Sequence, residues 1–220
     1  MDNSRRRRGR PTGESQLDRE VILRKALKAF ARFGFDGVKL SKLAGSIGVA
    51  NSLLNYHFDG KEELWKESMQ YAHQQLEEKF KNVYRNFKDL DGVSMLKVLT
   101  RQAVYFAAEF PEYFEAFALE LRSKTERADW LVDELVHPLN ERIIQNFKRQ
   151  MEDGNIKDLP TVNILMMITG AAQMIFFYDR ILKRQYNINI FDPEEIERHA
   201  DGLVEVMFNG IIQSNNKTKN

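Results

Sequence analysis

The sequence predicts an all-α protein of about nine helices, in which a small amino-terminal three-helix domain with a helix-turn-helix precedes a larger helical domain. Apolar residues recur at helical spacing along most of the 220 residues, and no window shows the sustained apolar alternation, bounded by turns, that is typical of a strand. Pro111, Pro160 and Pro193 stand where a helix can begin, since the first helical residue needs no N–H donor. We find no internal repeat, and 43% hydrophobic residues are enough for a substantial core.

The amino-terminal helices are predicted from their apolar spacing and from the glycines that follow them. In order, we expect helices over residues 17–33, 40–47, 51–58 and 61–87. Gly34 is suited to cap the first of these helices, and Gly48 ends the second. Asp59-Gly60 is predicted to form the turn that precedes the long fourth helix.

The remainder of the chain is predicted to be helical up to a short polar tail. We expect helices over residues 94–109, 111–123, 129–152, 160–186 and 193–213. Pro138 lies inside one of these ranges and should mark a kink or a boundary. Residues 214–220 are predicted to be a disordered tail.

The stretch 162–182 is long enough to suggest a membrane span. It carries several polar and charged residues, namely Asn163, Thr169, Gln173, Asp179 and Arg180. A helix that is apolar on nearly all sides is more simply buried twice, by its own domain and by a partner subunit. We therefore favour a dimer interface over a membrane.

Charge is distributed unevenly along the chain. Residues 1–61 carry 13 Lys and Arg against 6 Asp and Glu, a net charge of +7, whereas residues 62–220 carry 20 against 26, a net charge of −6. Five arginines lie within the first ten residues, and like charges cannot bury a core, so residues 1–16 are predicted to be a disordered basic arm. A concentrated positive segment indicates a polyanionic partner, and nucleic acid is favoured because the segment is not an amphipathic membrane helix.

Composition excludes several classes of protein. The chain has no cysteine, which rules out disulfides, thiolate metal sites and thiol nucleophiles and fits a reducing compartment. Its four histidines are scattered, and there is neither an HExxH motif nor a glycine-rich phosphate loop after a strand. We therefore expect no enzyme, no metal and no cofactor. The basic start is followed by a polar stretch, unlike a secretory signal, and we expect a cytoplasmic protein.

Residues 40–58 match the pattern of a helix-turn-helix, whose second helix enters the major groove of DNA. Gly48 supplies the turn, and Val49 is expected to fill the core between the two helices. Further core positions are Leu43, Ala44, Ile47 and Leu54. Two amphipathic helices with a glycine between them are common, so the bare pattern is weak evidence.

The residues around this pattern are more specific. In order they are Phe30-Ala31-Arg32-Phe33-Gly34-Phe35, Leu43-Ala44 with Ile47-Gly48-Val49, Leu54-Asn55-Tyr56-His57-Phe58 and Lys61-Glu62-Glu63-Leu64. From Asp18 to about Met69 the chain thus resembles the tetracycline-repressor-like (TetR/AcrR) family of transcriptional regulators. Order and spacing fit the amino-terminal domain of that family without a gap, over about a quarter of the chain. The rest agrees only in being helical and of family length.

The resemblance implies a DNA-binding domain over residues 17–60 and a helical effector-binding and dimerisation domain over residues 61–213. It implies a bacterial, nucleoid-associated repressor that binds a pseudo-palindromic operator as a homodimer, through helices 160–186 and 193–213, and that a small molecule releases. A DNA-coating or regulatory protein without ligand control, or an enzyme, is the alternative. A thermal-shift screen would discriminate, since only a bound effector raises apparent stability.

The resemblance also implies which residues contact DNA. They are Ser41, Asn51, Ser52, Leu53, Asn55, Tyr56, His57 and Lys61, together with Lys39, which stands where the family usually has a Ser or Thr cap. Asn can pair with adenine, and Leu53 can contact a thymine methyl group. Because Leu53 and Asn55 replace the more usual small hydroxyl residue and tyrosine, base preference stays open.

Each assignment has an ordinary structural alternative. Tyr56 could cover the small core, His57 could be an incidental surface residue, and Lys61 could be a solvated helix start. Phe58 is expected in the core rather than on DNA.

The arginines of the arm gain meaning from their place before this domain. Arg8-Gly9-Arg10-Pro11 resembles the core of an AT-hook, an extended element whose arginines enter the minor groove of A·T-rich DNA. Arg7, Arg8 and Arg10 are therefore candidate DNA contacts. A tail that only attracts phosphate is an equal alternative, and a nuclear localisation signal is a weaker one.

The larger domain carries many aromatic and methionine residues that could line an effector pocket. The candidates are Tyr105, Phe106, Phe110, Tyr113, Phe114, Phe117, Trp130, His137, Met166, Met167, Gln173 and Phe177, with Met174 and Tyr178 beside them and Glu120 and Asn140 as further polar anchors. They favour a largely apolar or aromatic ligand. Such residues at helical spacing are also ordinary core, which is the alternative for each of them.

Overall fold

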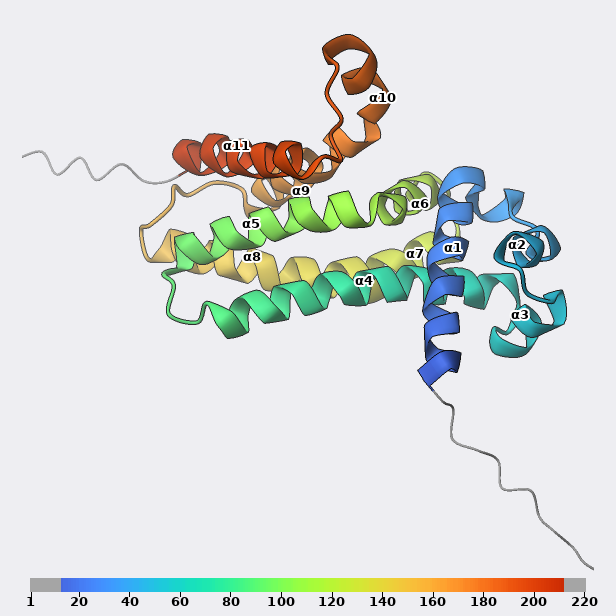
Figure 1. The fold of residues 1–220 in the computed structure, drawn as a ribbon. Helices are drawn as coiled ribbons and strands as arrows, with labels where there is room; N and C mark the ends of the chain where they lie inside the picture. The colour runs from blue at the N-terminus through green and yellow to red at the C-terminus, as the bar shows by residue number, and fades with distance from the viewer. Residues whose placement is uncertain (1–12, 212–220) are drawn as a thin grey trace, which may run out of the picture. The chain divides into compact units, whose positions relative to one another are not determined.

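The computed structural model describes residues 13–211, which form helices and no strand (Figure 1). The helices are α1 Gly13–Gly37, α2 Leu40–Ile47, α3 Asn51–His57, α4 Gly60–Asn86, α5 Gly92–Glu109, α6 Pro111–Leu121, α7 Glu126–Trp130, α8 His137–Glu152, α9 Thr161–Phe177, α10 Asp179–Ile181 and α11 Pro193–Ile211. Two π-helical segments accompany them, η1 Leu131–Val136 and η2 Leu182–Tyr186. The predicted all-α class is confirmed.

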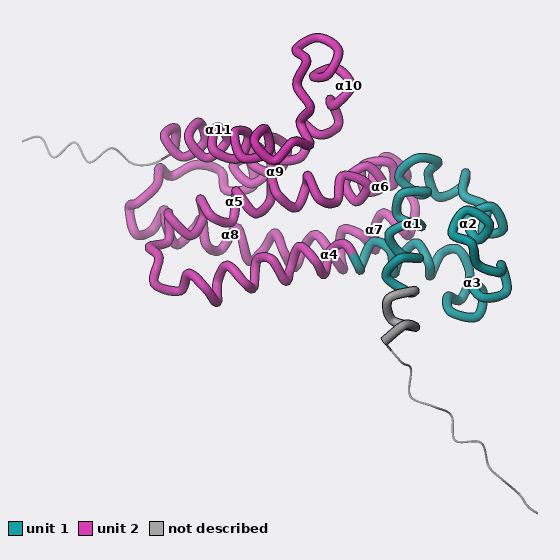
Figure 2. The backbone as a smooth tube through the Cα atoms, viewed as in Figure 1, with its two compact units in different colours: residues 1–71 teal, residues 72–220 magenta. Residues whose placement is uncertain are grey.

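The chain divides into two compact units, residues 1–71 and residues 72–220, and the division falls within α4 (Figure 2). The predicted domain boundary at residue 60 stays a prediction. α1 begins at Gly13, so residues 13–16, which were expected in the basic arm, are helical. The rest of that arm, residues 1–12, and the tail 214–220 lie outside the described residues.

The first unit is built around the apolar faces of α1 to α4. Leu27, Phe30, Leu54, Leu64 and Trp65 are almost completely buried there, which removes large apolar surfaces from water. Helical geometry in α1 is interrupted at the predicted position: Gly34 has φ 67° and ψ 171°, a conformation that costs glycine little, and the chain then continues to Gly37.

The turn between α2 and α3 follows the helix-turn-helix prediction. Gly48 closes α2 in the left-handed region at φ 85°, and its N–H donates to the Ala44 carbonyl at 3.0 Å. The predicted core positions Leu43, Ala44 and Leu54 are buried, whereas Ile47 and Val49 are only half-buried. α3 ends at His57, and Phe58 is buried in extended backbone, so its predicted core role is confirmed.

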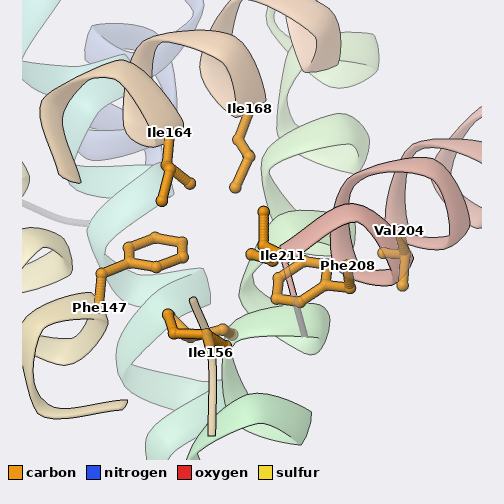
Figure 3. Packing of buried hydrophobic residues seen from close by; sticks show 8 residues of the cluster. Phe147, Ile156, Ile164, Ile168, Val204, Phe208 and Ile211 are labelled. Carbon is orange, nitrogen blue, oxygen red and sulfur yellow. The ribbon is translucent and has the colours of Figure 1, made fainter. Parts of the chain in front are cut away.

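The second unit is a helical bundle in which α5 packs against α8, α9 and α11, and α9 also contacts α8 and α11. Figure 3 shows one of its apolar clusters, in which Phe147 of α8, Ile164 and Ile168 of α9, and Phe208 and Ile211 of α11 meet. A second cluster joins α5, α9 and α11 around Val104, Ala172 and Ala200. These contacts fix α5 and α9, which form much of the wall of the cavity described below.

The predicted continuous helix over residues 160–186 is wrong. α9 ends at Phe177, Tyr178 leaves helical geometry at φ −100° and ψ 16°, and the Asp179 carboxylate accepts a bond from the Arg180 N–H. This local bond competes with the helical hydrogen bonds and begins a new turn instead. Within residues 13–211 no single helix is long and apolar enough to cross a membrane. The pair Thr161–Phe177 and Asp179–Tyr186 reaches that length only together and is bent by 54°.

The predicted helices 111–123 and 129–152 have different limits in the structure. α6 ends at Leu121, and Thr125 then caps α7 by accepting a 3.2 Å bond from the Ala128 N–H. Pro138 lies in the first turn of α8, directly after the π-helical segment η1. The predicted boundary at Pro138 is confirmed, and its cause is that proline has no N–H to continue the hydrogen-bond ladder.

Candidate nucleic-acid interface and ligand cavity

α3 presents nearly all of its side chains to solvent. Leu54 is its one buried residue, while the six others are exposed, namely Asn51, Ser52, Leu53, Asn55, Tyr56 and His57. Tyr56 is 84% exposed, so the alternative in which it covers the small core is wrong. The helix therefore offers amide, hydroxyl, imidazole and apolar groups on one free surface, which are the groups that read base edges and bind phosphate.

Arg19 of α1 holds the carboxyl end of α3. Its guanidinium donates to the His57 carbonyl at 3.5 Å, lies 4.6 Å from the centre of the Phe58 ring and forms an ion pair with Glu67. A cation at a helix carboxyl end is favoured by the helix dipole. Arg19 thus stabilises the position of the carboxyl end of α3. This contact is not predictable from the sequence, because no local pattern links a residue in α1 to the end of α3.

Lys39 and Ser41 lie at the start of α2. Lys39 is its N-cap residue, is exposed and makes no side-chain cap bond, so the predicted loss of the cap is confirmed. Its ammonium group is accessible to a phosphate. Ser41, the second residue of the helix, is also exposed. The structure thus leaves both side chains accessible on α2.

Lys61 at the start of α4 is half-buried and bonded. Its Nζ donates to the carbonyls of Phe35 at 3.0 Å and Val38 at 3.3 Å and lies 4.3 Å from the centre of the Phe35 ring. The alternative in which it is merely a solvated helix start is therefore wrong. An ammonium group has three donors, and these bonds leave one for a phosphate. The three arginine candidates Arg7, Arg8 and Arg10 lie outside the described residues.

The second unit holds an apolar cavity of about 90 Å³. It is lined by Leu76, Phe80, Leu96, Leu99, Thr100, Ala103, Phe106, Phe114, Leu139, Asn140, Ile143, Phe147, Leu165, Ile168, Thr169, Ala172 and Gln173, from α4, α5, α6, α8 and α9. Four of these residues are polar and none is charged. The cavity can therefore enclose a small apolar group and offer it a few neutral hydrogen-bonding partners.

Of the residues predicted to line an effector pocket, Phe106, Phe114 and Gln173 line this cavity, as does the anchor Asn140. The structure does not bring the others to it, namely Tyr105, Phe110, Tyr113, Phe117, Trp130, His137, Met166, Met167 and Phe177. Phe110 and Tyr113 are buried in an aromatic cluster, and Tyr105 donates to Glu197 at 2.6 Å. Met166 and Met167 are exposed, because α9 has a second apolar face that periodicity does not separate from the first.

Behind the cavity, His73 and Tyr113 form a buried polar pair. His73 Nδ1 lies 3.1 Å from the Tyr113 hydroxyl. Burial lowers the pKa of His73, although the neighbouring Glu77 carboxylate opposes this, and burial raises the pKa of Tyr113. Across residues 13–211 the acidic and histidine side chains do not gather into any group that could hold a metal ion.

Comparison with known proteins identifies the first unit. A family model described as "Bacterial regulatory proteins, tetR family" matches residues 22–67, which contain α2, α3 and the start of α4. These residues thus carry the amino-terminal domain of the tetR family of regulators. The chain is 24% identical to the HTH-type transcriptional regulator RutR of Escherichia coli K12 over 158 residues, 70% of this chain and 72% of that protein. The predicted family and its DNA-binding, transcription-regulating function are confirmed, and the family is not normally one of enzymes.

Solved structures show that the tetR-family fold extends over the second unit as well. A putative fatty acid metabolism regulator of Clostridium perfringens matches with a TM-score of 0.72 and 19% identity, covering 88% of this chain and all (100%) of that one. FadR of Bacillus subtilis, in complex with stearoyl-CoA, matches with a TM-score of 0.64 and 16% identity over 86% and 97% of the two chains. AibR, in complex with isovaleryl coenzyme A and operator DNA, matches with a TM-score of 0.69 and 18% identity over 87% and 98%.

Proposed function

We propose that this tetR-family protein is a repressor that binds a pseudo-palindromic operator as a homodimer and leaves it when a small, largely apolar ligand enters the cavity of the second unit. The exposed face of α3 is the observation that carries the proposal. Six neighbouring side chains of a short helix face solvent, within a segment that carries a net charge of +7. An exposed helix in a positively charged segment is suited to bind a polyanion.

The side chains divide into two roles. Asn51, Ser52 and Leu53 begin α3, and in a helix-turn-helix the amino-terminal residues of the recognition helix contact base edges. Tyr56 and His57, near its end, are suited to donate to phosphate, as are the ammonium groups of Lys39 and Lys61. Asn55 and Ser41 can serve either role.

The basic arm contributes charge beside this surface. Arg7, Arg8 and Arg10 would displace counterions from the duplex and could enter its minor groove. Removal of residues 1–10 should lower operator affinity and its salt dependence without changing the major-groove consensus. Unchanged affinity at low salt would show that the arm takes no part.

A second copy of the chain is the proposed cover for an exposed apolar surface on α9 and α11. Val162, Met166, Met167 and Met174 on α9 and Val206 on α11 are all exposed. Large apolar side chains that are exposed along neighbouring helices are suited to a protein interface. A two-fold dimer would present two α3 helices to a two-fold operator.

Ligand control is proposed from the cavity and from α4. The structures of FadR and AibR both contain an acyl-CoA molecule. This supports a ligand site in the second unit of the present protein, whose fold is similar. α4 carries Lys61 at its start and the cavity residues Leu76 and Phe80 further along. A ligand that binds better when the two α3 helices are wrongly spaced for DNA would lower operator affinity by the ratio of its two affinities.

A DNA-binding protein without ligand control is the second candidate, and like the first it would act in the cytoplasm on the nucleoid. The two candidates differ in one observable, since only an effector-controlled protein gains thermal stability with a small molecule that also releases DNA.

Selection of bound sequences from random DNA tests the proposal. We expect a two-fold symmetric consensus whose half-sites lie about one helical turn, roughly 10 base pairs, apart or a multiple of that. A salt titration of the best site should show the steep loss of affinity that counterion release produces. Equal binding to all sequences would refute the operator-specific function.

A further inference from the structure

We propose that the cavity of the second unit selects an electrically neutral ligand: a small apolar group that bears one uncharged hydrogen-bonding function, such as the carbonyl of an amide, ketone or thioester. The proposal rests on the proposed ligand control and specifies its chemistry. The side chains of Asn140 and Gln173 would bind the neutral function, and the apolar wall would bind the remainder.

Among the residues that the structure describes, none with a charged side chain lines the cavity. Its polar side chains there are Thr100, Asn140, Thr169 and Gln173. An ionised ligand group inside it would lose its hydration and meet no counter-ion, and burying an unpaired charge is very costly. The cavity therefore disfavours both anions and cations.

The two threonines have already committed their protons. The Thr100 hydroxyl donates to the Leu96 carbonyl at 2.9 Å, and the Thr169 hydroxyl donates to the Leu165 carbonyl at 2.8 Å. Each hydroxyl oxygen retains lone pairs and can only accept a further hydrogen bond. The threonines thus add weak acceptors to the wall and stabilise no anion.

The two amides are different. Within the described residues, neither Asn140 on α8 nor Gln173 on α9 has a hydrogen-bond partner, although both are half-buried and line the cavity. A half-buried amide without a protein partner is a site for a ligand or a water molecule. Each amide offers both a donor and an acceptor, so the pair can bind a neutral amide through both kinds of group or a neutral carbonyl through the donors. A carboxylate could accept from the same donors, but it would bring an unpaired charge into the cavity.

A second chamber of about 140 Å³ adjoins the cavity and is lined by charged as well as apolar groups. It shares Phe80, Leu139 and Ile143 with the cavity and adds Glu77, Lys81 and Arg142. Glu77 forms ion pairs with both Lys81 and Arg142. A thioester could thus place its neutral acyl end in the cavity and its charged remainder in or beyond this second chamber.

Matched six-carbon probes test the proposal on the full chain. Hexanamide and hexanoate are nearly isosteric and differ in charge at pH 8, and hexylammonium supplies the opposite charge. By calorimetric titration and thermal denaturation, we expect hexanamide to bind at least about tenfold more tightly than either ion. Between pH 8 and pH 5.5 the apparent affinity for hexanoate should rise about tenfold or more as its neutral form accumulates, while hexanamide binding stays unchanged.

Substitutions assign the recognition to the two amides. Asn140→Leu and Gln173→Leu should each weaken hexanamide binding about tenfold while toluene, which needs no hydrogen bond, still binds. Gln145→Leu is the matched control, because Gln145 lies on the exposed face of α8 and does not line the cavity. The control should bind hexanamide as the unchanged chain does.

The outcomes distinguish a failure of the neutral-ligand proposal from a failure of the proposed ligand control. Hexanoate binding at pH 8 as tightly as hexanamide would overturn the neutral-ligand proposal and leave ligand control intact. If no probe binds and none releases operator DNA, both the proposal and ligand control at this cavity fail, although operator binding without a probe would still stand. Hexanoyl-CoA tests whether the ligand is a thioester or a free small molecule. If hexanoyl-CoA binds more tightly than hexanamide, the ligand is a thioester, and if it binds more weakly, the ligand is a free molecule.

Discussion

The hydrogen bond of 3.1 Å between His73 and Tyr113 joins α4 to α6 at a buried position. The ring of Tyr113 also packs against Phe106 and Phe114, with ring centres 5.8 and 5.1 Å away. Both of these phenylalanines line the cavity. The pair therefore lies directly behind the cavity wall, and α4, which carries it, also carries Lys61 in the first unit.

Tyr113→Phe should destabilise the second unit. The change keeps the ring and removes the hydroxyl, so a nitrogen of the buried His73 ring loses its partner. We expect a loss of about 1–2 kcal/mol in the free energy of unfolding, measured by urea denaturation. Phe117→Leu, which removes a neighbouring ring without a polar group, is the comparison. A Tyr113→Phe chain as stable as the original would show that the hydrogen bond contributes nothing.

Stability should fall with acidity because of His73. Burial holds its pKa below the ordinary value of 6.5, so the unfolded chain takes up a proton at a pH where the folded chain does not. Stability is thus highest above about pH 6.5 and falls as pH drops below it, until the folded-state pKa is passed. His199, whose pKa is also lowered by burial, acts in the same direction. Urea denaturation at pH 7.5 and pH 5.5 should show a smaller difference for His73→Gln than for the unchanged chain.

Arg19→Gln should loosen the recognition helix. The change removes the bond to the His57 carbonyl and the contact with the Phe58 ring, and it leaves Glu67 without its ion-pair partner. Because Arg19 is partly exposed, we expect only about 1 kcal/mol of lost stability. Amide exchange in α3 should accelerate, and operator affinity should fall about tenfold. Lys25→Gln, at an exposed position of the same helix, should change neither quantity.

Much of the first unit was predictable, because its determinants are local in sequence. Gly34 and Gly48 mark the breaks that the structure shows, and the single buried residue of α3 follows from apolar spacing. The role of Arg19 was not predictable, since it depends on a contact between residues far apart in the chain. Lys61 was recognised from its position, but its bonds to two carbonyls required the structure.

The cavity was harder to predict than the DNA surface. An aromatic residue at helical spacing looks the same in a core, on a cavity wall or at an interface, so Tyr113, Phe106 and Met167 could not be told apart. Their different places follow from how α5, α6 and α9 pack. The break at Tyr178 was missed for a related reason: it depends on a bond between a side chain and the backbone, and apolar spacing does not record such bonds.

Lys61→Ala and Asn51→Ala should weaken DNA binding in different ways. Lys61→Ala should lower affinity for every sequence and reduce the salt slope by about one, because it removes a phosphate contact. It should also cost about 1 kcal/mol of stability, since the bonds to Phe35 and Val38 are lost. Asn51→Ala should instead relax the preference at particular bases and leave the salt slope unchanged. If both variants lose specificity and salt dependence alike, the proposed division between base and phosphate contacts is wrong.

Val206→Glu should convert the proposed dimer to monomer. Val206 is 74% exposed on α11, so a carboxylate there costs the isolated chain little, within about 0.5 kcal/mol. In a two-fold interface the change occurs on both chains and buries two like charges, which should raise the dimer dissociation constant at least about tenfold. Sedimentation velocity measures this, and operator affinity should fall in parallel. Leu90→Glu introduces the same charge at an exposed apolar residue between α4 and α5 and should leave the dimer intact. Equal dissociation constants for the two variants would place the interface elsewhere than on α11.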